Sequence, residues 1–341
     1  MWHYQEAALC MDKNKSNNSL LEFENTLVEI ENRIRDLENA SATHGMDLST
    51  QINELREQYK REAVRIYSNL SPWERVRVAR HKDRPTSQDY VGLMFTDFVE
   101  LHGDRAFRDD AAIITGFGKL DDERVMLVGH RKGRNTRERM QCNWGCAHAE
   151  GFRKALLKMV IAQRFRLPIV TLIDTQGAYP GVGAEERGVA QAIAENILAM
   201  SEMRVPIVSV VIGEGGSGGA LGIGMADRLL ILEHAYYSVI SPEGCAAILW
   251  KSAEKKSDAA VALKITANNL LKMGIADEIV PEPIGGAHRD HRQIAETLKG
   301  AILRNIRELQ AIPIDELLQL RYEKYRKIGA YGQAAPSGQP G

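Results

Sequence analysis

A glycine-rich stretch at residues 210–224, VVIGEGGSGGALGIG, is compatible with three different chemistries. In the first, Gly213, Gly215 and Gly218 form G-x-G-x-x-G, with Glu233 twenty positions after Gly213, which is the pattern of a dinucleotide-binding loop. However, the stretch comes late in the chain, and two further glycines follow where the helix over the pyrophosphate should run. Each glycine costs a helix about 1 kcal/mol relative to alanine, so this short motif is a weak signal.

In the second chemistry, Gly215, Ser217 and Gly219 form G-x-S-x-G, the nucleophile elbow of a serine hydrolase. An elbow serine needs an acid and a histidine farther along the chain, and a base within hydrogen-bond distance. The candidates for these partners are Asp258, Asp277, His288 and His291. A serine among four glycines is also explained by its small size, which makes this a minority interpretation.

The third chemistry uses the main chain alone. A glycine-rich turn from a strand into a helix leaves adjacent N–H groups free to bind an anion or a developing oxyanion, and glycine lets a flat group approach the backbone. Removing one such donor typically costs about 3 kcal/mol of transition-state stabilisation. The alternative is a close-packed turn without a ligand, but a second glycine-rich loop in an equivalent place favours a site.

That second loop belongs to an internal repeat that positions both loops. Residues 166–170 lead into TLIDTQGAYPG, and 38 residues later residues 204–208 lead into SVVIGEGGSGG. Each copy combines a predicted helix (152–164 and 189–203) with a short apolar strand, which indicates an α/β fold with a mainly parallel sheet. Ligands bind at the carboxyl ends of such strands. We therefore expect DTQGAYPG, EGGSGG and ISPEG to lie side by side.

Other segments flank this repeat. Apolar residues at helical spacing predict two helices, at 20–37 and 48–66, joined by a loop at 39–47. This pair closes on the main domain or forms a docking surface for another chain. Residues 73–103 are predicted to be helical with a break at Arg84-Pro85, and residues 112–120 and 125–130 to form a β-hairpin. A further strand pair is expected at 228–232 and 236–240, and helices from Ile294 onward.

Composition excludes several classes of protein. The 341 residues contain 44 Lys and Arg against 45 Asp and Glu, and the resulting net charge of −1 does not favour binding to nucleic acids or membrane surfaces. Four irregularly spaced cysteines suit a reducing compartment. No run of eighteen apolar residues and no signal peptide is found. We expect a soluble, cytoplasmic protein.

Five stretches of the chain form long recognisable blocks. They are GHRKGR at 129–134, IDTQGAYPGVGAEERG at 173–188, VIGEGGSGGAL at 211–221, SVISPEGCAAILWK at 238–251 and PEPIGGAHRD at 281–290. These blocks resemble one known family, the carboxyltransferase α subunit of bacterial multi-subunit acetyl-CoA carboxylase, and the likeness extends from about Leu20 to Tyr331.

The resemblance implies a fold and the boundaries of its parts. The fold would be a crotonase-like spiral of ββα units at 71–290, preceded by a helical hairpin at 19–70 and followed by C-terminal helices at 291–331. Residues 1–18 have no counterpart in the family and are expected to be disordered, as is the tail at 332–341.

The resemblance also implies an activity and partners. The reaction is transfer of a carboxyl group from carboxybiotin, carried on a biotin carboxyl carrier protein, to acetyl-CoA, which gives malonyl-CoA in the first committed step of fatty acid biosynthesis. A zinc-bearing β subunit completes the enzyme as α2β2, no metal is expected in this chain, and a biotin carboxylase consumes the ATP. The alternatives are an inhibitor-tolerant second copy, a crotonase-fold serine hydrolase and a non-catalytic scaffold.

The family's site maps onto the two glycine-rich loops. The resemblance implies that the main-chain N–H groups of Gly218 and Gly219 hold the ureido oxygen of biotin as negative charge develops there. The biotin pocket would be lined by Gly177, Ala178, Tyr179, Gly181, Gly215 and Gly216. The expected ligands of the CoA phosphates are Arg131, Lys132 and Arg134.

The chain departs from the family pattern in two loops. Gln176 replaces the proline of I-D-T-P-G, and CAHAEG at 146–151 replaces M-P-A-P-E-G, so prolines are also missing at 147 and 149. A proline that fits its loop stabilises a protein by about 0.4–1 kcal/mol. Cys142, Cys146 and His148 have no standard zinc spacing and are interpreted as neutral loop residues.

Overall fold

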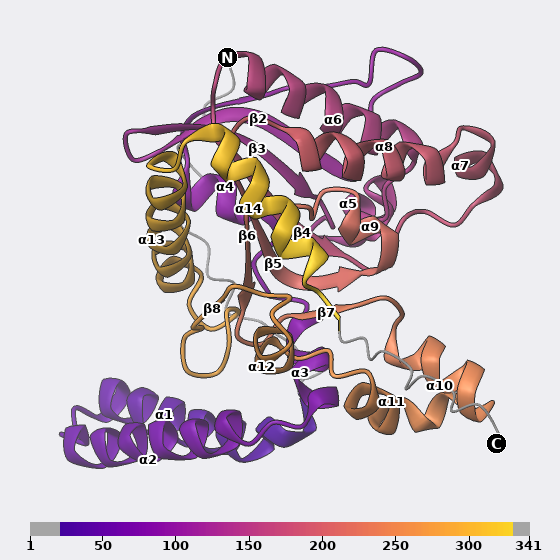
Figure 1. The fold of residues 1–341 in the computed structure, drawn as a ribbon. Helices are drawn as coiled ribbons and strands as arrows, with labels where there is room; N and C mark the ends of the chain where they lie inside the picture. The colour runs from indigo at the N-terminus through magenta and orange to yellow at the C-terminus, as the bar shows by residue number, and fades with distance from the viewer. Residues whose placement is uncertain (1–20, 330–341) are drawn as a thin grey trace, which may run out of the picture. The chain divides into compact units, whose positions relative to one another are not determined.

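The structure, a computed structural model, describes residues 21–329, which form two compact units that divide between Asn69 and Leu70 (Figure 1). The segments predicted to be disordered, 1–18 and 332–341, lie outside the described residues. No helix among the described residues is long and apolar enough to span a membrane.

The first unit is the predicted helical hairpin. After a short 3-10 turn, α1 (Asn25–His44) and α2 (Ser49–Ser68) pack against each other around Leu27, Ile30 and Ala63. The connection is shorter than the predicted loop at 39–47, because α1 continues to His44. Helix α1 ends where Gly45 adopts a left-handed φ of 63°, a conformation that glycine tolerates best.

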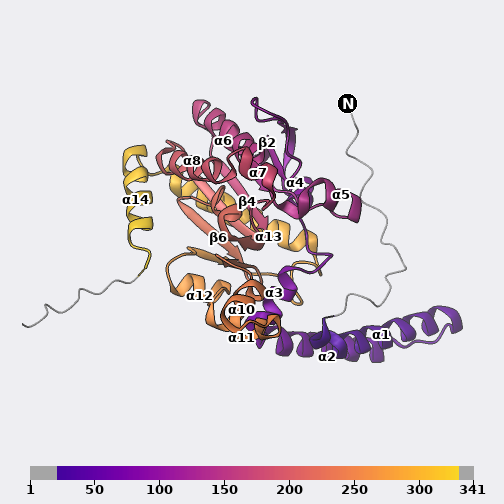
Figure 2. The ribbon, with the colours of Figure 1, turned by 90° about the vertical axis from the view of Figure 1, so that its right-hand side faces the viewer.

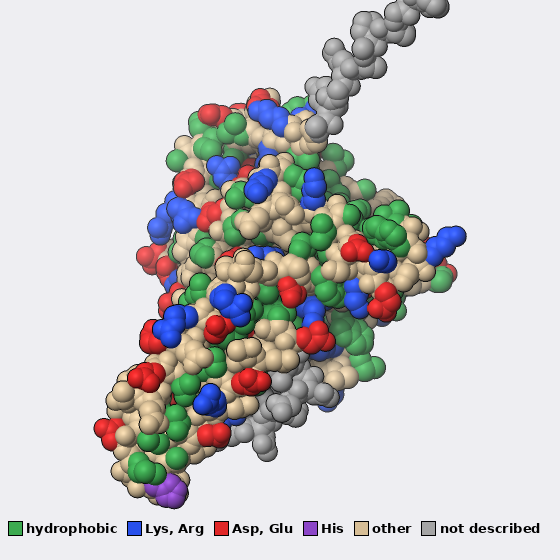
Figure 3. All heavy atoms as spheres, turned by 90° about the horizontal axis from the view of Figure 1, so that it is seen from below, with side chains coloured by type: hydrophobic (Ala, Val, Ile, Leu, Met, Phe, Trp, Pro, Cys, Tyr) green, Lys and Arg blue, Asp and Glu red, His purple; other side chains and the backbone are tan. Residues whose placement is uncertain are grey.

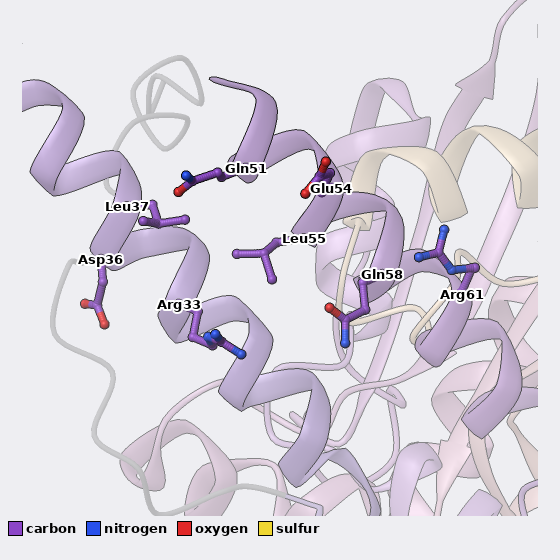
Figure 4. A pocket seen from close by; sticks show the side chains of 8 residues that line it. All are labelled: Arg33, Asp36, Leu37, Gln51, Glu54, Leu55, Gln58 and Arg61. Atoms are coloured by element: carbon purple, nitrogen blue, oxygen red, sulfur yellow. The ribbon is translucent and has the colours of Figure 1, made fainter. Parts of the chain in front are cut away.

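A cavity of about 700 Å³ opens between the distal parts of the two helices. Leu37 and Leu55 face each other across it (Figure 4), and the other lining residues are polar or charged. They are Arg33, Asp36, Gln51, Glu54, Gln58 and Arg61. Two helices alone thus leave part of their shared apolar stripe open.

The second unit is built on one eight-stranded sheet with the order β1-β2-β3-β4-β5-β6-β8, and β7 pairs with the end of β5. Pairing is antiparallel from β1 to β3 and parallel from β3 onward. The strands are β1 (Thr96–Glu100), β2 (Ile113–Leu120), β3 (Glu123–His130), β4 (Ile169–Thr175), β5 (Ile207–Gly216), β6 (Arg228–Leu232), β7 (Tyr236–Ser238) and β8 (Glu278–Val280).

The internal repeat is confirmed as two equivalent units. β4 and β5 pair in parallel with Ile169 opposite Ile207, and both strands are buried along their whole length. The helices that precede them, α6 (Ala149–Arg164) and α8 (Val189–Glu202), lie side by side in both views (Figures 1 and 2). Continuous apolar strands covered by helices are typical of parallel sheets.

The prediction of helix over residues 73–103 is wrong at its end. α3 (Pro72–Ala79) and α4 (Ser87–Met94) form, but Thr96–Glu100 is strand β1. The rings of Phe95 and Phe98 lie over Gly116 and Gly118 of β2, where a Cβ atom would come within 2.8 Å of them. Pairing with the otherwise open edge of β2 therefore decides the conformation, and helical spacing in the sequence does not reveal that edge.

The remaining helices surround the sheet and its carboxyl edge. α13 contributes a buried stripe of Ile294, Leu298, Ile302 and Ile306 to the core, which confirms the predicted C-terminal helical region. These helices are α5 (Thr136–Gln141), α7 (Val182–Glu186), α9 (Ser217–Leu221), α10 (Pro242–Trp250), α11 (Lys256–Ala262), α12 (Ala267–Lys272), α13 (His291–Gln310) and α14 (Ile314–Arg326).

Candidate active site

The two glycine-rich loops are in direct backbone contact at the carboxyl edge of the sheet. A Cβ atom on Gly216 would lie 2.1 Å from the carbonyl oxygen of Gln176, and one on Gly219 would lie 2.4 Å from the carbonyl carbon of Gly177. No real side chain fits such spaces. Glycine is therefore required at both positions to let the loop after β5 pass over the loop after β4.

One of the two main-chain donors, Gly219, lies within this contact, and the other, Gly218, lies beside it. Ser217 begins α9 immediately after β5, so the N–H groups of Gly218 and Gly219 are in the first helical turn and have no acceptor within the helix. Gly218 is half-buried, and the space beside its α-carbon is open apart from Ile193 at 3.6 Å. This arrangement can present N–H groups to a bound oxygen atom.

The hydrolase interpretation finds one supporting feature and no partners. Ser217 has a φ of 51°, a left-handed conformation that an elbow nucleophile also adopts. The four candidate partners, however, are engaged elsewhere. Asp258 forms an ion pair with Lys255, and Asp277 accepts hydrogen bonds from the Leu229 N–H and the Lys324 ammonium. The His288 ring stacks on the His81 ring. The His291 ring forms a hydrogen bond with the carbonyl oxygen of Asp83.

The dinucleotide interpretation lacks its helix. α9 has five residues, and it follows the fifth strand along the chain rather than the first. In a dinucleotide-binding fold the acidic residue after the fingerprint binds a ribose hydroxyl. Here the Glu233 carboxylate accepts the main-chain N–H of Glu282.

The loop after β4 is braced by the segment before α6. The Tyr179 N–H donates to the Ala147 carbonyl oxygen at 2.9 Å, and the His148 ring stacks on the Tyr179 ring at 4.2 Å. Burial raises the pKa of Cys146, opposed by hydrogen bonds to the Thr175 side chain and the Gln176 backbone. The two loops that depart from the family pattern are thus packed together as one wall.

Beneath the loops lies a buried charge network that sequence reasoning missed. The Lys132 ammonium lies 2.8 Å from Asp174 and 2.6 Å from Glu214, and the Arg80 guanidinium lies 2.7 Å from Glu214 and 2.5 Å from Glu243. The available signal was an acid at the end of each strand of the repeat, Asp174 and Glu214. Glu243 belongs to ISPEG, so Arg80 joins that segment to EGGSGG.

The network fixes the charge of its members. Burial alone would raise the pKa of Glu214, but the charges of Lys132 and Arg80 lower it to about 2. Burial likewise acts to lower the pKa of Lys132, but Asp174 and Glu214 raise it above its ordinary value. Both groups therefore stay ionised over the whole physiological range.

The three predicted phosphate ligands have different surroundings. Lys132 is committed to its two carboxylates, and Arg134 is half-exposed with its guanidinium 2.6 Å from Asp89. The Nε atom of Arg131 is buried and has no hydrogen-bond partner within the described part of the chain.

The cysteines offer no metal centre within the described residues. Cys142 is buried as a free thiol, and burial raises its pKa, which disfavours the thiolate that binds metals. No group of three His, Cys, Asp or Glu side chains in residues 21–329 is placed to hold a metal ion.

Comparison with known proteins assigns the chain to a family. Residues 20–329 match the family described as acetyl co-enzyme A carboxylase carboxyltransferase-like. The acetyl-coenzyme A carboxylase carboxyl transferase subunit α of Rhodopirellula baltica is 54% identical over 285 residues, which cover 84% of this chain and 89% of that protein. The corresponding subunit of Thermus thermophilus is 50% identical over 313 residues, 92% of this chain and 99% of that protein.

Solved structures support the same fold at much lower identity. The transcarboxylase 12S structure matches with a TM-score of 0.51 and 20% identity, covering 75% of this chain and 44% of that one. A Pseudomonas malonate decarboxylase hetero-tetramer in complex with coenzyme A matches with a TM-score of 0.52 and 18% identity, covering 64% and 87%. The sheet and its flanking helices have the crotonase-like α/β fold, and the chain belongs to the acetyl-CoA carboxylase carboxyltransferase α-subunit family.

Proposed function

We propose that this chain is the α subunit of a carboxyltransferase that moves a carboxyl group from carboxybiotin to acetyl-CoA and so forms malonyl-CoA for fatty acid biosynthesis. The observation that carries the proposal is the backbone contact between the two glycine-rich loops. It leaves the first-turn N–H groups of α9 at a position where Gly218 is half-buried and a Cβ atom on it would meet only the Ile193 side chain, at 3.6 Å. A flat, neutral ring can approach such a position.

Within this site the chain binds and orients its substrate. Carboxybiotin supplies an activated carboxyl group. The Gly218 and Gly219 N–H groups would donate to the ureido oxygen of biotin, where negative charge grows as the carboxyl group leaves. The opposite wall would be formed by Gly177, Ala178, Tyr179 and Gly181, with Gly215 and Gly216 at the base of the turn. No side chain of this chain needs to accept a proton.

Binding of the CoA phosphates would fall to Arg131 and Arg134. Guanidinium groups suit phosphate because they donate in a fixed fork. The Arg134 side chain is half-exposed, so its ion pair with the partly buried Asp89 is screened by solvent and Arg134 can exchange Asp89 for a phosphate at little cost. Lys132, in contrast, would have to leave two buried carboxylates, so we remove it from the proposed CoA site.

The site is proposed to be completed by a second chain. Five large apolar side chains are exposed around α10 and α11, next to the strand that pairs with the end of β5, and hydrophobic side chains gather over that part of the surface in Figure 3. They are Val239, Ile248, Leu249, Trp250 and Val261, which are 42–75% exposed. Apolar patches of this kind favour a partner protein.

We propose that this partner is a zinc-bearing β subunit in an α2β2 assembly, which would supply donors for the enolate of acetyl-CoA. The biotin carboxyl carrier protein and a biotin carboxylase would act with it, in the cytoplasm. The homologous α subunits and the multi-chain architecture of the malonate decarboxylase support this proposal.

The test is to mix the purified chain with carboxybiotin and acetyl-CoA, with and without a β subunit from the same organism, and to measure malonyl-CoA. Turnover should require both chains. Turnover by the isolated chain would contradict the proposal, and ester hydrolysis would revive the role of Ser217 as a nucleophile. A silent mixture would leave a non-catalytic scaffold as the better interpretation.

A further inference from the structure

The buried carboxylate of Glu214 lies three residues before the turn that carries the main-chain donors. It belongs to the last part of β5, its side chain is 2% exposed, and its own N–H donates to Asp174 at 2.9 Å. A group with this burial and a pKa of about 2 cannot reach a substrate or accept a proton from one. Any role in the reaction must therefore act through its partners.

Both oxygen atoms of Glu214 are bound by side chains from different elements. One accepts from Lys132, just beyond β3, at 2.6 Å and lies 3.5 Å from the Gln176 amide. The other accepts from Arg80, at the end of α3, at 2.7 Å and from the Tyr236 hydroxyl of β7 at 2.6 Å. One carboxylate thus links segments from both sides of β5.

The cations bound to Glu214 reach one step farther. Lys132 also contacts Asp174 at the end of β4, and Arg80 also contacts Glu243 at the start of α10. The network contains three carboxylates and two cations. Removing the charge of Glu214 would leave both cations, which are largely but not fully buried, with fewer anions. A buried charge that has lost its partner drives rearrangement around it.

We infer that Glu214 is the positioning residue of this site: through Lys132 and Arg80 it holds the ends of β3, β4, β5 and β7 so that the Gly218 and Gly219 N–H groups keep one direction. This inference rests on the proposed function and adds to it a side chain that the reaction depends on without touching the substrate. Misplacement of catalytic groups by about 1 Å can cost about a hundredfold in rate.

The first experiment compares Glu214→Gln with wild type in the reconstituted α–β enzyme. The amide keeps the shape of the side chain but removes the charge. We expect kcat to fall at least tenfold and KM for acetyl-CoA to stay within about threefold, because the donors are displaced and the binding surface is not. The pH profile of the residual activity should keep its shape, since Glu214 does not titrate in the working range.

The matched control is Glu282→Gln. Glu282 is an equally buried carboxylate that forms an ion pair with Arg84 and accepts hydrogen bonds from the main chain of His234 and Ala287. Arg84 in turn reaches β5 at the main-chain oxygen of Ile212, outside both loops. The Glu282→Gln variant should have a lowered melting temperature, as Glu214→Gln should, but the kcat of the folded enzyme should be unchanged. Equal loss of kcat in both variants would show a merely structural role and overturn the inference.

A double-variant cycle separates positioning from CoA binding. Lys132→Met should lower kcat as Glu214→Gln does, and the combined variant should lose little more than either alone. A raised KM for acetyl-CoA with unchanged kcat in Lys132→Met would instead identify Lys132 as a phosphate ligand and contradict the inference.

A milder variant covers the case in which Glu214→Gln does not fold. Tyr236→Phe removes one donor to Glu214 and should lower kcat about threefold to tenfold at constant KM. If Tyr236→Phe keeps the wild-type kcat, the inference about Glu214 is wrong but the proposed function still stands. If the unmutated α–β mixture shows no turnover, both the proposed function and the inference are wrong.

Discussion

Adding a single methyl group at Gly219 should disable the enzyme, whereas the same change at the adjacent Gly218 should not disturb the fold. At Gly219 the new Cβ atom would lie 2.4 Å from the Gly177 carbonyl carbon and 2.6 Å from the Ala178 nitrogen, against an ordinary contact of at least 3.4 Å. The two loops must separate by about 1 Å to accept it. The collision is with the chain's own backbone and not with a bound substrate.

The size of the effect follows from that separation. Overpacking of this kind costs about 1–3 kcal/mol of stability, and a 1 Å displacement of the donors costs about a hundredfold in kcat. At Gly218 the nearest atom is 3.6 Å away, and alanine favours helix by about 1 kcal/mol. Gly218→Ala should therefore melt at or above the wild-type temperature.

Thermal melting and turnover of the reconstituted enzyme test both variants. A Gly219→Ala enzyme that keeps the wild-type melting temperature and more than a third of wild-type kcat would refute the packing argument. A Gly218→Ala protein that melts far below the wild-type temperature would contradict the conclusion that there is room for a methyl group at Gly218.

Three further predictions concern separate positions. Ser217→Gly removes the hydroxyl group and suits the φ of 51°, so turnover should stay within about threefold; a loss above a hundredfold would identify a nucleophile. Gln176→Pro restores the family's residue and should change turnover, or inhibition by compounds directed at this site, by more than about twofold, roughly 0.4 kcal/mol; smaller changes would mean that Gln176 is neutral. Burial lowers the pKa of His288 from 6.5 to about 2, so the unfolded chain binds a proton that the folded chain does not, and stability is lost as pH falls below about 6.5. In urea unfolding between pH 6 and 4.5, His288→Asn should reduce the slope of the unfolding free energy by about 1.4 kcal/mol per pH unit, and an unchanged slope would contradict this.

Local patterns predicted much of the fold. The hairpin of β2 and β3, the repeat of β4 and β5 and the helices before them follow from short-range periodicity and turn residues, and the structure confirms them. β1 could not be predicted, because its conformation depends on an open edge of β2 that no local pattern marks. The end of α1 was misplaced for a smaller reason, since Ser41 and Thr43 are tolerated inside the helix and Gly45 is the residue that ends it.

The sequence by itself determined that two glycine-rich loops follow two parallel strands, and that they meet at one edge, because strand period and loop composition are local properties of the chain. Only the tertiary structure decided why Gly216 and Gly219 must be glycine, since the atoms that exclude a side chain belong to residues about forty positions away. The tertiary structure also determines the partners of Lys132. The basic run around Lys132 suggests a phosphate ligand, but its ammonium group is bound by two buried carboxylates. Burial and the pairing of charges depend on which distant segments pack together, and spacing along the chain carries no record of that.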